Sequence, residues 1–387
     1  MAGSVRCFMK FNLGLLSKNV TRHVALNQKR TLYDKQALGL NAYLSTRKYY
    51  QKQFLNLEEE FRNKMETYVA NDATGMIFTE DLKVMLHLIE KTPRDLNLIM
   101  KMLEKFNNQS CETRFGNYTF GPIVMRALYN LNEWECALNL FNNPEYTVFF
   151  NQLMTYQILM DLLYENKQYV EMRRVYNTIQ TRITEGTVHP RNALLLVTAA
   201  CYKENSPDSF RYAIDLWTEL NGRGYPVMRR VLIHLSALAL MQGQPNIALE
   251  ILSTSKKPRY IGIRCIKIMA FARIDRLYDV IPYFRNSLQL DDSTTKKETY
   301  FRDTIEEVEA AIRRNHISPQ AEIVTLLKMI KSNNLVQEET LDDHINTEIV
   351  STGPVAPRQS SEHRIHRTGS EISGPKFIRR PGLRELV

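Results

Sequence analysis

The chain has 387 residues, of which 44% are hydrophobic, so it can bury a large core as one extended array or as two to three domains. Its five cysteines are widely spaced and include no Cys-x-x-Cys pair, which argues against a disulfide framework and against a zinc site. The net charge of +9 does not by itself indicate a nucleic-acid binder, because residues 1–50 carry a net +8 and residues 351–387 a net +4, which leaves the body at −3.

The first 33 residues have the pattern of a targeting segment. They contain no Asp or Glu, and basic residues alternate with apolar ones such as Phe8 and Leu13. This pattern is typical of a mitochondrial presequence, so we expect residues 1–33 to be a transit peptide and the mature chain to reside in the mitochondrial matrix. A basic N-terminal arm that is retained is the alternative. Because no apolar run approaches the roughly 20 residues of a membrane-spanning helix, we expect no membrane insertion.

Apolar residues recur every three or four positions through most of the chain and predict helices. Residues 34–70 are expected to form a helical cap, and residues 71–290 show a repeat. Six predicted helices there end on a large apolar residue, with a smaller or flexible apolar residue four positions earlier on the same face. These pairs are Met102 with Phe106, Ala137 with Phe141, Met172 with Tyr176, Ala213 with Trp217, Ala248 with Leu252, and Val280 with Phe284.

A second apolar segment precedes each of these helices, and polar turns separate the two. The preceding segments are 79–89, 118–129, 154–164, 192–202, 228–241 and 261–272. The unit is therefore a helical hairpin of about 35 residues. One hairpin cannot bury both apolar faces by itself, so neighbours must stack, and the sequence predicts an all-α solenoid with one concave surface.

Residues 154–163, MTYQILMDLL, resemble the first helix of a pentatricopeptide repeat, which typically opens with a Thr-Tyr pair. The unit closes with Gly186 and Pro190, similar to the turn of that family, and residues 118–121 open the preceding unit in the same way. Three further stretches, 117–122, 158–163 and 201–210, look like animal mitochondrial members of the family. The likeness runs from about residue 31 to about residue 290. It implies a right-handed superhelix and a role in mitochondrial RNA maturation, and hence in respiratory-chain function.

The resemblance also implies where RNA would bind, because first helices line the concave face in this family. Phosphates require Lys or Arg contacts, and exposed bases require amide or aromatic side chains. The family's base-selecting position, after the helix-opening Tyr, is usually Asn, Thr or Ser, whereas this chain has Gln157 there and Gly121 in the unit before. The predicted RNA-binding residues on first helices and adjoining turns are Gln157, Arg126, Arg191, Arg229, Arg230, Arg264 and Lys267. For each basic residue, a solvated surface charge is the alternative.

The remaining segments complete the prediction. Residues 291–344 are expected to form closing helices, and residues 345–387, rich in Ser, Gly, Pro and Arg, a disordered tail. We find no zinc deaminase signature, no phosphate-binding glycine loop and no nucleophile elbow, so we expect no enzymatic activity, no cofactor and no metal. The predicted partners are single-stranded mitochondrial RNA and RNA-processing enzymes. A protein-binding scaffold of a matrix complex is the rival function.

Overall fold

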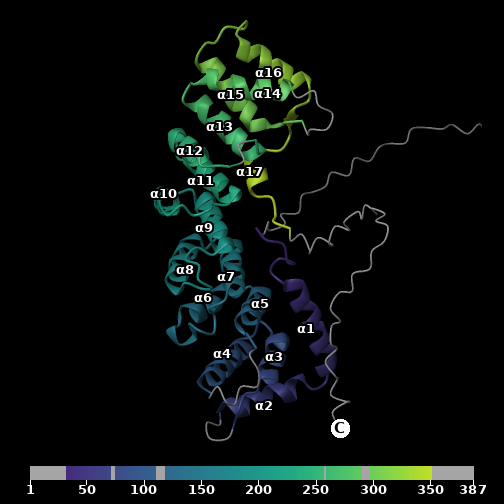
Figure 1. The fold of residues 1–387 in the computed structure, drawn as a ribbon. Helices are drawn as coiled ribbons and strands as arrows, with labels where there is room; N and C mark the ends of the chain where they lie inside the picture. The colour runs from purple at the N-terminus through teal and green to yellow at the C-terminus, as the bar shows by residue number, and fades with distance from the viewer. Residues whose placement is uncertain (1–31, 71–74, 110–117, 257–258, 290–296, 351–387) are drawn as a thin grey trace, which may run out of the picture. The chain divides into compact units, whose positions relative to one another are not determined.

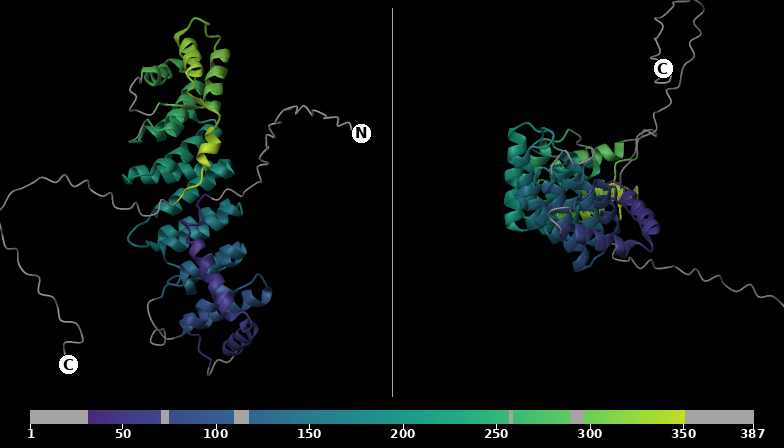
Figure 2. Two further views of the ribbon diagram at one scale, coloured as in Figure 1. Left: turned by 90° about the vertical axis from the view of Figure 1, so that its right-hand side faces the viewer. Right: turned by 90° about the horizontal axis from the view of Figure 1, so that it is seen from below.

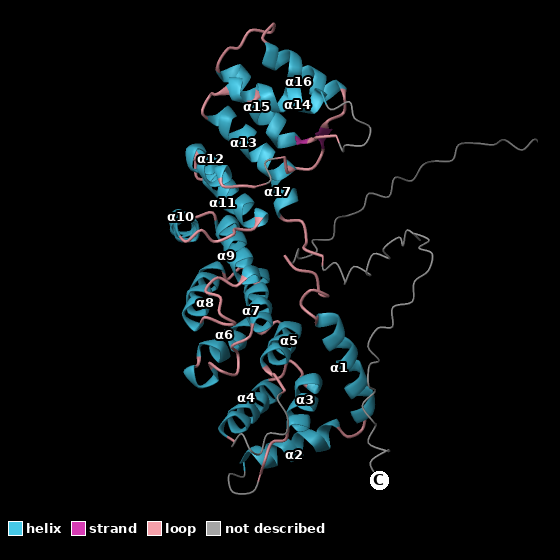
Figure 3. Cartoon of the chain, viewed as in Figure 1, coloured by secondary structure: helices cyan, strands magenta, loops and turns pink. Residues whose placement is uncertain are grey.

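The structure, a computed structural model, describes residues 32–70, 75–109, 118–256, 259–289 and 297–350 (Figure 1). These residues form 17 α-helices and one pair of parallel two-residue strands, β1 (Tyr300–Phe301) and β2 (Val336–Gln337). Figure 3 shows that helices account for nearly all of the regular structure. The predicted all-α class is therefore confirmed. Residues 1–31 of the predicted presequence and residues 351–387 of the predicted tail lie outside the described residues.

Most helices alternate between two layers, which we call first and second helices. The first helices are α3 (Thr79–Leu88), α5 (Gly121–Leu131), α7 (Leu153–Glu165), α9 (Arg191–Glu204), α11 (Arg229–Met241), α13 (Ile261–Arg273) and α15 (Arg302–Arg314). The second helices are α4 (Pro93–Asn108), α6 (Trp134–Asn142), α8 (Tyr169–Arg182), α10 (Pro207–Gly222), α12 (Pro245–Ser253), α14 (Ile281–Gln289) and α16 (Glu322–Ser332). Short 3-10 helices, Pro144–Tyr146 and Leu277–Asp279, follow α6 and precede α14.

The repeat predicted from the apolar pairs is confirmed as a stack of helical hairpins. From α5 to α15 each first helix packs on the next one, and from α3 to α12 each second helix packs on the first helix before it. All twelve paired residues of the repeat are buried, at 7% exposure or less. A small residue such as Ala137 lets the neighbouring helix approach, while Phe141 fills the space between hairpins, with roughly 1.5–3 kcal/mol gained for each large side chain removed from water.

Local sequence signals explain why the hairpins turn where they do. Ser206 caps α10, since its hydroxyl accepts a hydrogen bond from the Ser209 amide at 3.0 Å, and Pro207 occupies the first helical position, where no amide donor is needed. The preceding helix ends at Asn205, whose φ of 48° lies in the left-handed region that Asn tolerates better than most residues. Asn132 ends α5 in the same way.

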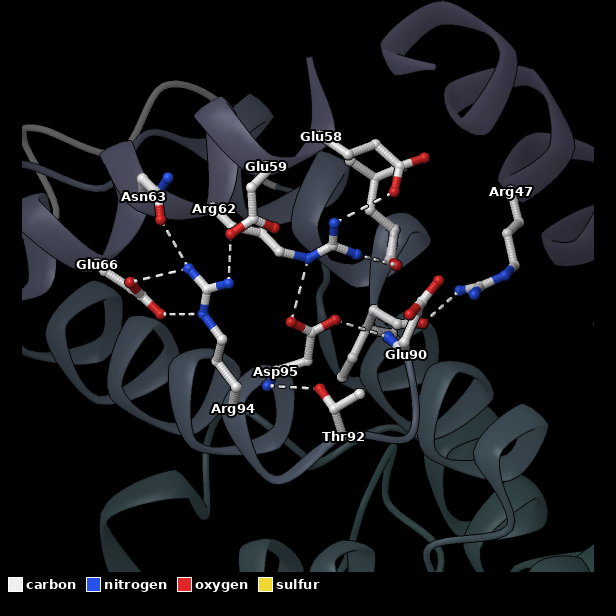
Figure 4. A network of polar contacts seen from close by, with 12 residues as sticks. Arg47, Glu58, Glu59, Arg62, Asn63, Glu66, Glu90, Thr92, Arg94 and Asp95 are labelled. Carbon is white, nitrogen blue, oxygen red and sulfur yellow. Dashed lines mark hydrogen bonds and ion pairs between the residues drawn. The ribbon is translucent and has the colours of Figure 1, made fainter. Parts of the chain in front are cut away.

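Polar contacts attach the cap helices α1 (Leu40–Phe54) and α2 (Glu58–Ala70) to the stack (Figure 4). Arg62 of α2 donates from Nε to Asp95 Oδ1 of α4 at 3.1 Å, and both side chains are buried. Arg94 reaches back from α4 to Glu59 and Glu66 on the exposed side of the same interface. The buried pair fixes the position of α2, because a charge left unpaired in this site would be strongly destabilising.

Two segments form a third layer on the side of the first helices that faces away from the second helices (Figure 1). Helix α1 packs on α3 and α5, and helix α17 (Leu341–Ile345) packs on α11 and α13. The left panel of Figure 2 shows the N-terminal segment and the segment around α17 approaching each other over the stack. Their backbones meet in a parallel bridge between Tyr33 and Ile349.

The bridge shows that folded structure extends beyond the predicted boundaries at both ends. Leu32 and Tyr33, which the sequence assigns to the transit peptide, are 3% and 5% exposed. Ile345, the predicted start of the disordered tail, is the buried last residue of α17, and Ile349 N donates to Leu32 O at 2.8 Å. Residues 345–350 thus have a defined path, which differs from the prediction of disorder. None of the described helices combines the length and apolar character needed to cross a bilayer.

Candidate nucleic-acid interface

The face of the first helices that turns away from the second helices, here called the first-helix face, is covered along its middle. Ten consecutive residues are buried in each of α7 (155–164), α9 (193–202) and α11 (231–240). A helix packed on one side only would expose a polar stripe every three to four residues. The concave surface that the sequence predicts along the first helices is therefore not open at these three helices, because the chain's own end segments lie across them.

One hollow remains open beside this cover, and we call it the basic hollow. It has a volume of about 730 Å³ and lies where α9 and α11 begin, next to the Tyr33–Ile349 bridge. Its described lining includes four cations and no Asp or Glu. The lining residues used below are Tyr33, Arg191, Asn192, Trp217, Arg229, Arg230 and Lys256. Because helix N-termini carry partial positive charge and unpaired amides, their position here adds to the attraction for an anion.

The structure brings three predicted RNA-binding residues together in this hollow. Arg191 is the first residue of α9 and is exposed. Arg229 and Arg230 begin α11; the Arg229 guanidinium lies 3.5 Å from the centre of the Tyr260 ring, which orients it by a cation–π contact. Arg230 is half-buried, and burial is the largest cause of its lowered pKa, although a guanidinium stays charged at any physiological pH.

Two buried donors at the hollow have no hydrogen-bond acceptor among the described residues. They are Nη1 of Arg230 and Nε1 of Trp217, whose side chain is only 7% exposed. A buried donor without an acceptor costs roughly 1–3 kcal/mol, so these two groups lower the stability of the packing around them. The four cations and the absence of Asp and Glu among the described lining residues favour an anion in this hollow, such as a phosphate.

Gln157 itself does not line the hollow. It is 4% exposed, and its Oε1 accepts a hydrogen bond from Asn192 Nδ2 at 2.7 Å. Asn192, the second residue of α9, does line the hollow, where its side-chain amide is held in place by Gln157. The sequence did not predict Asn192 or Trp217 as binding residues. It did predict the adjacent Arg191, and it placed Trp217 at a repeat position.

The other three predicted residues lie elsewhere and two of them have internal partners. Arg126 of α5 donates from Nε to the Leu38 carbonyl at 2.9 Å and so holds the N-terminal segment. Arg264 is 3% exposed and lies 3.3 Å from Glu298. Lys267 of α13 is half-buried, and burial lowers its pKa. The structure therefore groups Arg191, Arg229 and Arg230 and separates them from these three.

Comparison with known proteins agrees with the repeat architecture. No protein-family model matches the chain. The chain is similar to proteins named pentatricopeptide repeat-containing protein 2, mitochondrial: that of Pongo abelii is 28% identical over 310 residues, covering 80% of this chain and 74% of the relative. The Homo sapiens protein is 27% identical over the same length, covering 80% and 73%, and the Xenopus laevis protein is 24% identical over 278 residues, covering 69% of each. These relatives support a mitochondrial helical-repeat protein.

Proposed function

We propose that this chain is an RNA-binding protein of the mitochondrial matrix that holds single-stranded RNA during transcript maturation and thereby supports the respiratory chain. It acts without catalysis of its own and presents the RNA to processing enzymes. The observation that carries the proposal is the basic hollow, whose described lining has four cations and no carboxylate and which lies where the first helices α9 and α11 begin. The mitochondrial names of the relatives support the location.

The hollow suits a short single-stranded segment. Its volume of about 730 Å³ lies in the usual range of ligand sites, roughly 300–1,000 Å³. Arg191, Arg229 and Arg230 supply the charge that displaces counterions from phosphates. Asn192, whose Nδ2 donates to Gln157, offers its remaining N–H and its carbonyl to a base edge.

A salt titration of RNA binding tests the proposal. The triple variant Arg191→Gln/Arg229→Gln/Arg230→Gln should bind single-stranded RNA more weakly than the wild type. Each lost phosphate contact on a single strand lowers the slope of log K against log salt by about 0.7, so the slope should fall by about 2. The matched control is Arg174→Gln/Arg211→Gln/Arg285→Gln, which removes three exposed arginines from second helices.

The rival function, a protein-binding scaffold of a mitochondrial matrix complex, makes a different prediction in the same experiment. Without phosphate contacts in the hollow, the wild type would bind RNA weakly. The hollow variant and the second-helix control would then show the same decrease in RNA affinity. That result would remove RNA binding at the hollow from consideration. A protein partner captured through the hollow would then be the function to pursue.

A further inference from the structure

The segment that covers the C-terminal half of the first-helix face is acidic. Residues 338–348, here called the acidic strap, contain five carboxylates and no Lys or Arg; the carboxylates belong to Glu338, Glu339, Asp342, Asp343 and Glu348. The strap includes α17 and lies against α11 and α13, more than 60 residues away in sequence. A run of carboxylates has the charge pattern of a nucleic-acid backbone.

Specific contacts hold the strap on the first-helix face. Asp342 Oδ1 accepts a hydrogen bond from the Tyr202 hydroxyl at 2.9 Å and lies 3.4 Å from Lys203 Nζ, both at the end of α9. His344 Nε2 lies 3.1 Å from the Tyr260 hydroxyl, and Tyr260 is the residue on which Arg229 stacks. The strap therefore shares partners with the basic hollow.

Cations of α11, α13 and the connecting segments also lie near the strap. Burial is the largest cause that lowers the pKa of His344, and the nearby charges of Arg230 and Arg229 lower it further. Glu339 lines a second hollow of about 550 Å³ together with Arg259, Lys297 and the Arg264–Glu298 pair. An RNA strand that extended from the basic hollow along α11 and α13 would need this same surface.

Ile349, which directly follows the strap, meets the N-terminal segment through few contacts. Two backbone hydrogen bonds join them, from Ile349 N to Leu32 O at 2.8 Å and from Asp34 N to Ile349 O at 3.2 Å. The contacts of Asp342 with Tyr202 and Lys203 are partly exposed, and exposed ion pairs are weak and sensitive to salt. Leu341 and Ile345 of the strap are buried, at 6% and 4% exposure, so opening the strap also exposes these two side chains.

We propose that the acidic strap is an internal competitor of RNA: when it is closed, RNA reaches only the basic hollow, and a longer single strand binds by displacing the strap from α11 and α13. This inference rests on the proposed function. In this proposal the strap over the first-helix face acts as a gate, and its carboxylates occupy the places that RNA phosphates would take. RNA affinity is therefore set partly by the cost of opening the strap.

The test compares full-length wild-type protein with two variants, using a labelled single-stranded RNA of about 20 nucleotides as the probe. The first variant, Glu339→Gln/Asp342→Asn/Glu348→Gln, removes three strap charges but keeps an acceptor oxygen for Tyr202. Its matched control, Glu135→Gln/Asp215→Asn/Glu250→Gln, removes the same charge from exposed positions of second helices. The second variant, Ile349→Pro, removes the amide that donates to Leu32.

The strap variant and Ile349→Pro should bind RNA at least about threefold more tightly than the wild type and the control, since each exposed ion pair contributes a factor of roughly 1.4–5. RNA should also accelerate hydrogen exchange at the Asp34 and Ile349 amides of the wild type. Equal affinities of wild type and variants, equal gains in variant and control, or slower exchange at these amides would overturn the competition alone. If no form binds RNA, the proposed function fails, and the competition fails with it.

Discussion

Asp161 provides the sharpest test of how the third layer covers the stack. This residue of α7 is fully buried, and burial is the main cause that raises its pKa to about 8; the neighbouring Glu165 and Glu348 also raise it. The Tyr129 hydroxyl lies 2.9 Å from Asp161 Oδ2 and 2.6 Å from Glu165 Oε1. Since one hydroxyl proton can serve only one acceptor, a protonated Asp161 satisfies the cluster by donating to the Tyr129 oxygen.

The magnitude follows from linkage between protonation and folding. In the unfolded chain an Asp has a pKa near 3.9, so between about pH 4 and pH 8 the folded protein retains a proton that the unfolded chain releases. The contribution is fully present below pH 4 and is lost as pH rises through 8. At about 1.4 kcal/mol per pH unit, the free energy of unfolding should fall by up to about 4 kcal/mol between pH 5 and pH 8.

The substitution Asp161→Asn removes the titrating group and keeps an oxygen that accepts from Tyr129. Urea denaturation of wild type and variant at pH 5, 6, 7 and 8 gives the two stability profiles. We expect the free energy of unfolding of the variant to rise steadily relative to that of the wild type as pH increases. At pH 8 the variant should be the more stable protein. Parallel profiles would show that Asp161 is hydrated and ionised, and hence that Tyr33 and Glu348 do not seal the first-helix face.

Three further predictions test other parts of the fold. Arg62→Leu should cost about 3 kcal/mol in chemical denaturation, because buried Asp95 loses its cation, whereas exposed Arg94→Leu should cost clearly less; equal losses would contradict the burial difference. Gly39→Ala should cost about 1–2 kcal/mol of folding stability and lower the melting temperature, because Gly39 has a φ of +69° and a Cβ there would lie 2.8 Å from Arg126 Nη2. An unchanged melting temperature would show that the N-terminal segment is not fixed at Gly39. Burial lowers the pKa of His234 to about 3, so below pH 6.5 the folded protein binds fewer protons than the unfolded chain and loses stability as the pH falls. His234→Gln should reduce this loss of stability at acidic pH. An unchanged loss in the variant would show that another group causes it.

The repeat could be predicted because its signals are local. Pairs such as Ala137 and Phe141 lie four residues apart on one helix face, and the six predicted first helices begin within three residues of their observed starts. Polar turns between hairpins are likewise encoded by neighbouring residues, such as Asn205 and Ser206. Periodicity and capping therefore suffice for the stack.

The cover over the first-helix face could not be predicted, because its contacts join segments far apart in the chain. Tyr202 and Asp342 are 140 residues apart. The strap is polar and acidic, and α17 has only five residues, so the strap resembles a flexible end in composition. The sequence likewise predicted Arg126 and Arg264 to bind RNA, because their partners are distant in the chain. In the structure Arg126 binds the Leu38 carbonyl and Arg264 pairs with Glu298.

Ultraviolet crosslinking in living cells tests the central claim most directly. Tagged full-length protein and its Arg191→Gln/Arg229→Gln/Arg230→Gln variant are crosslinked, and the RNA bound to each is sequenced. We predict that mitochondrial transcripts are enriched with the wild type and lost with the variant while the protein level stays equal. Recovery of no RNA above background with the wild type, or identical recovery with both proteins, would contradict RNA binding at the basic hollow.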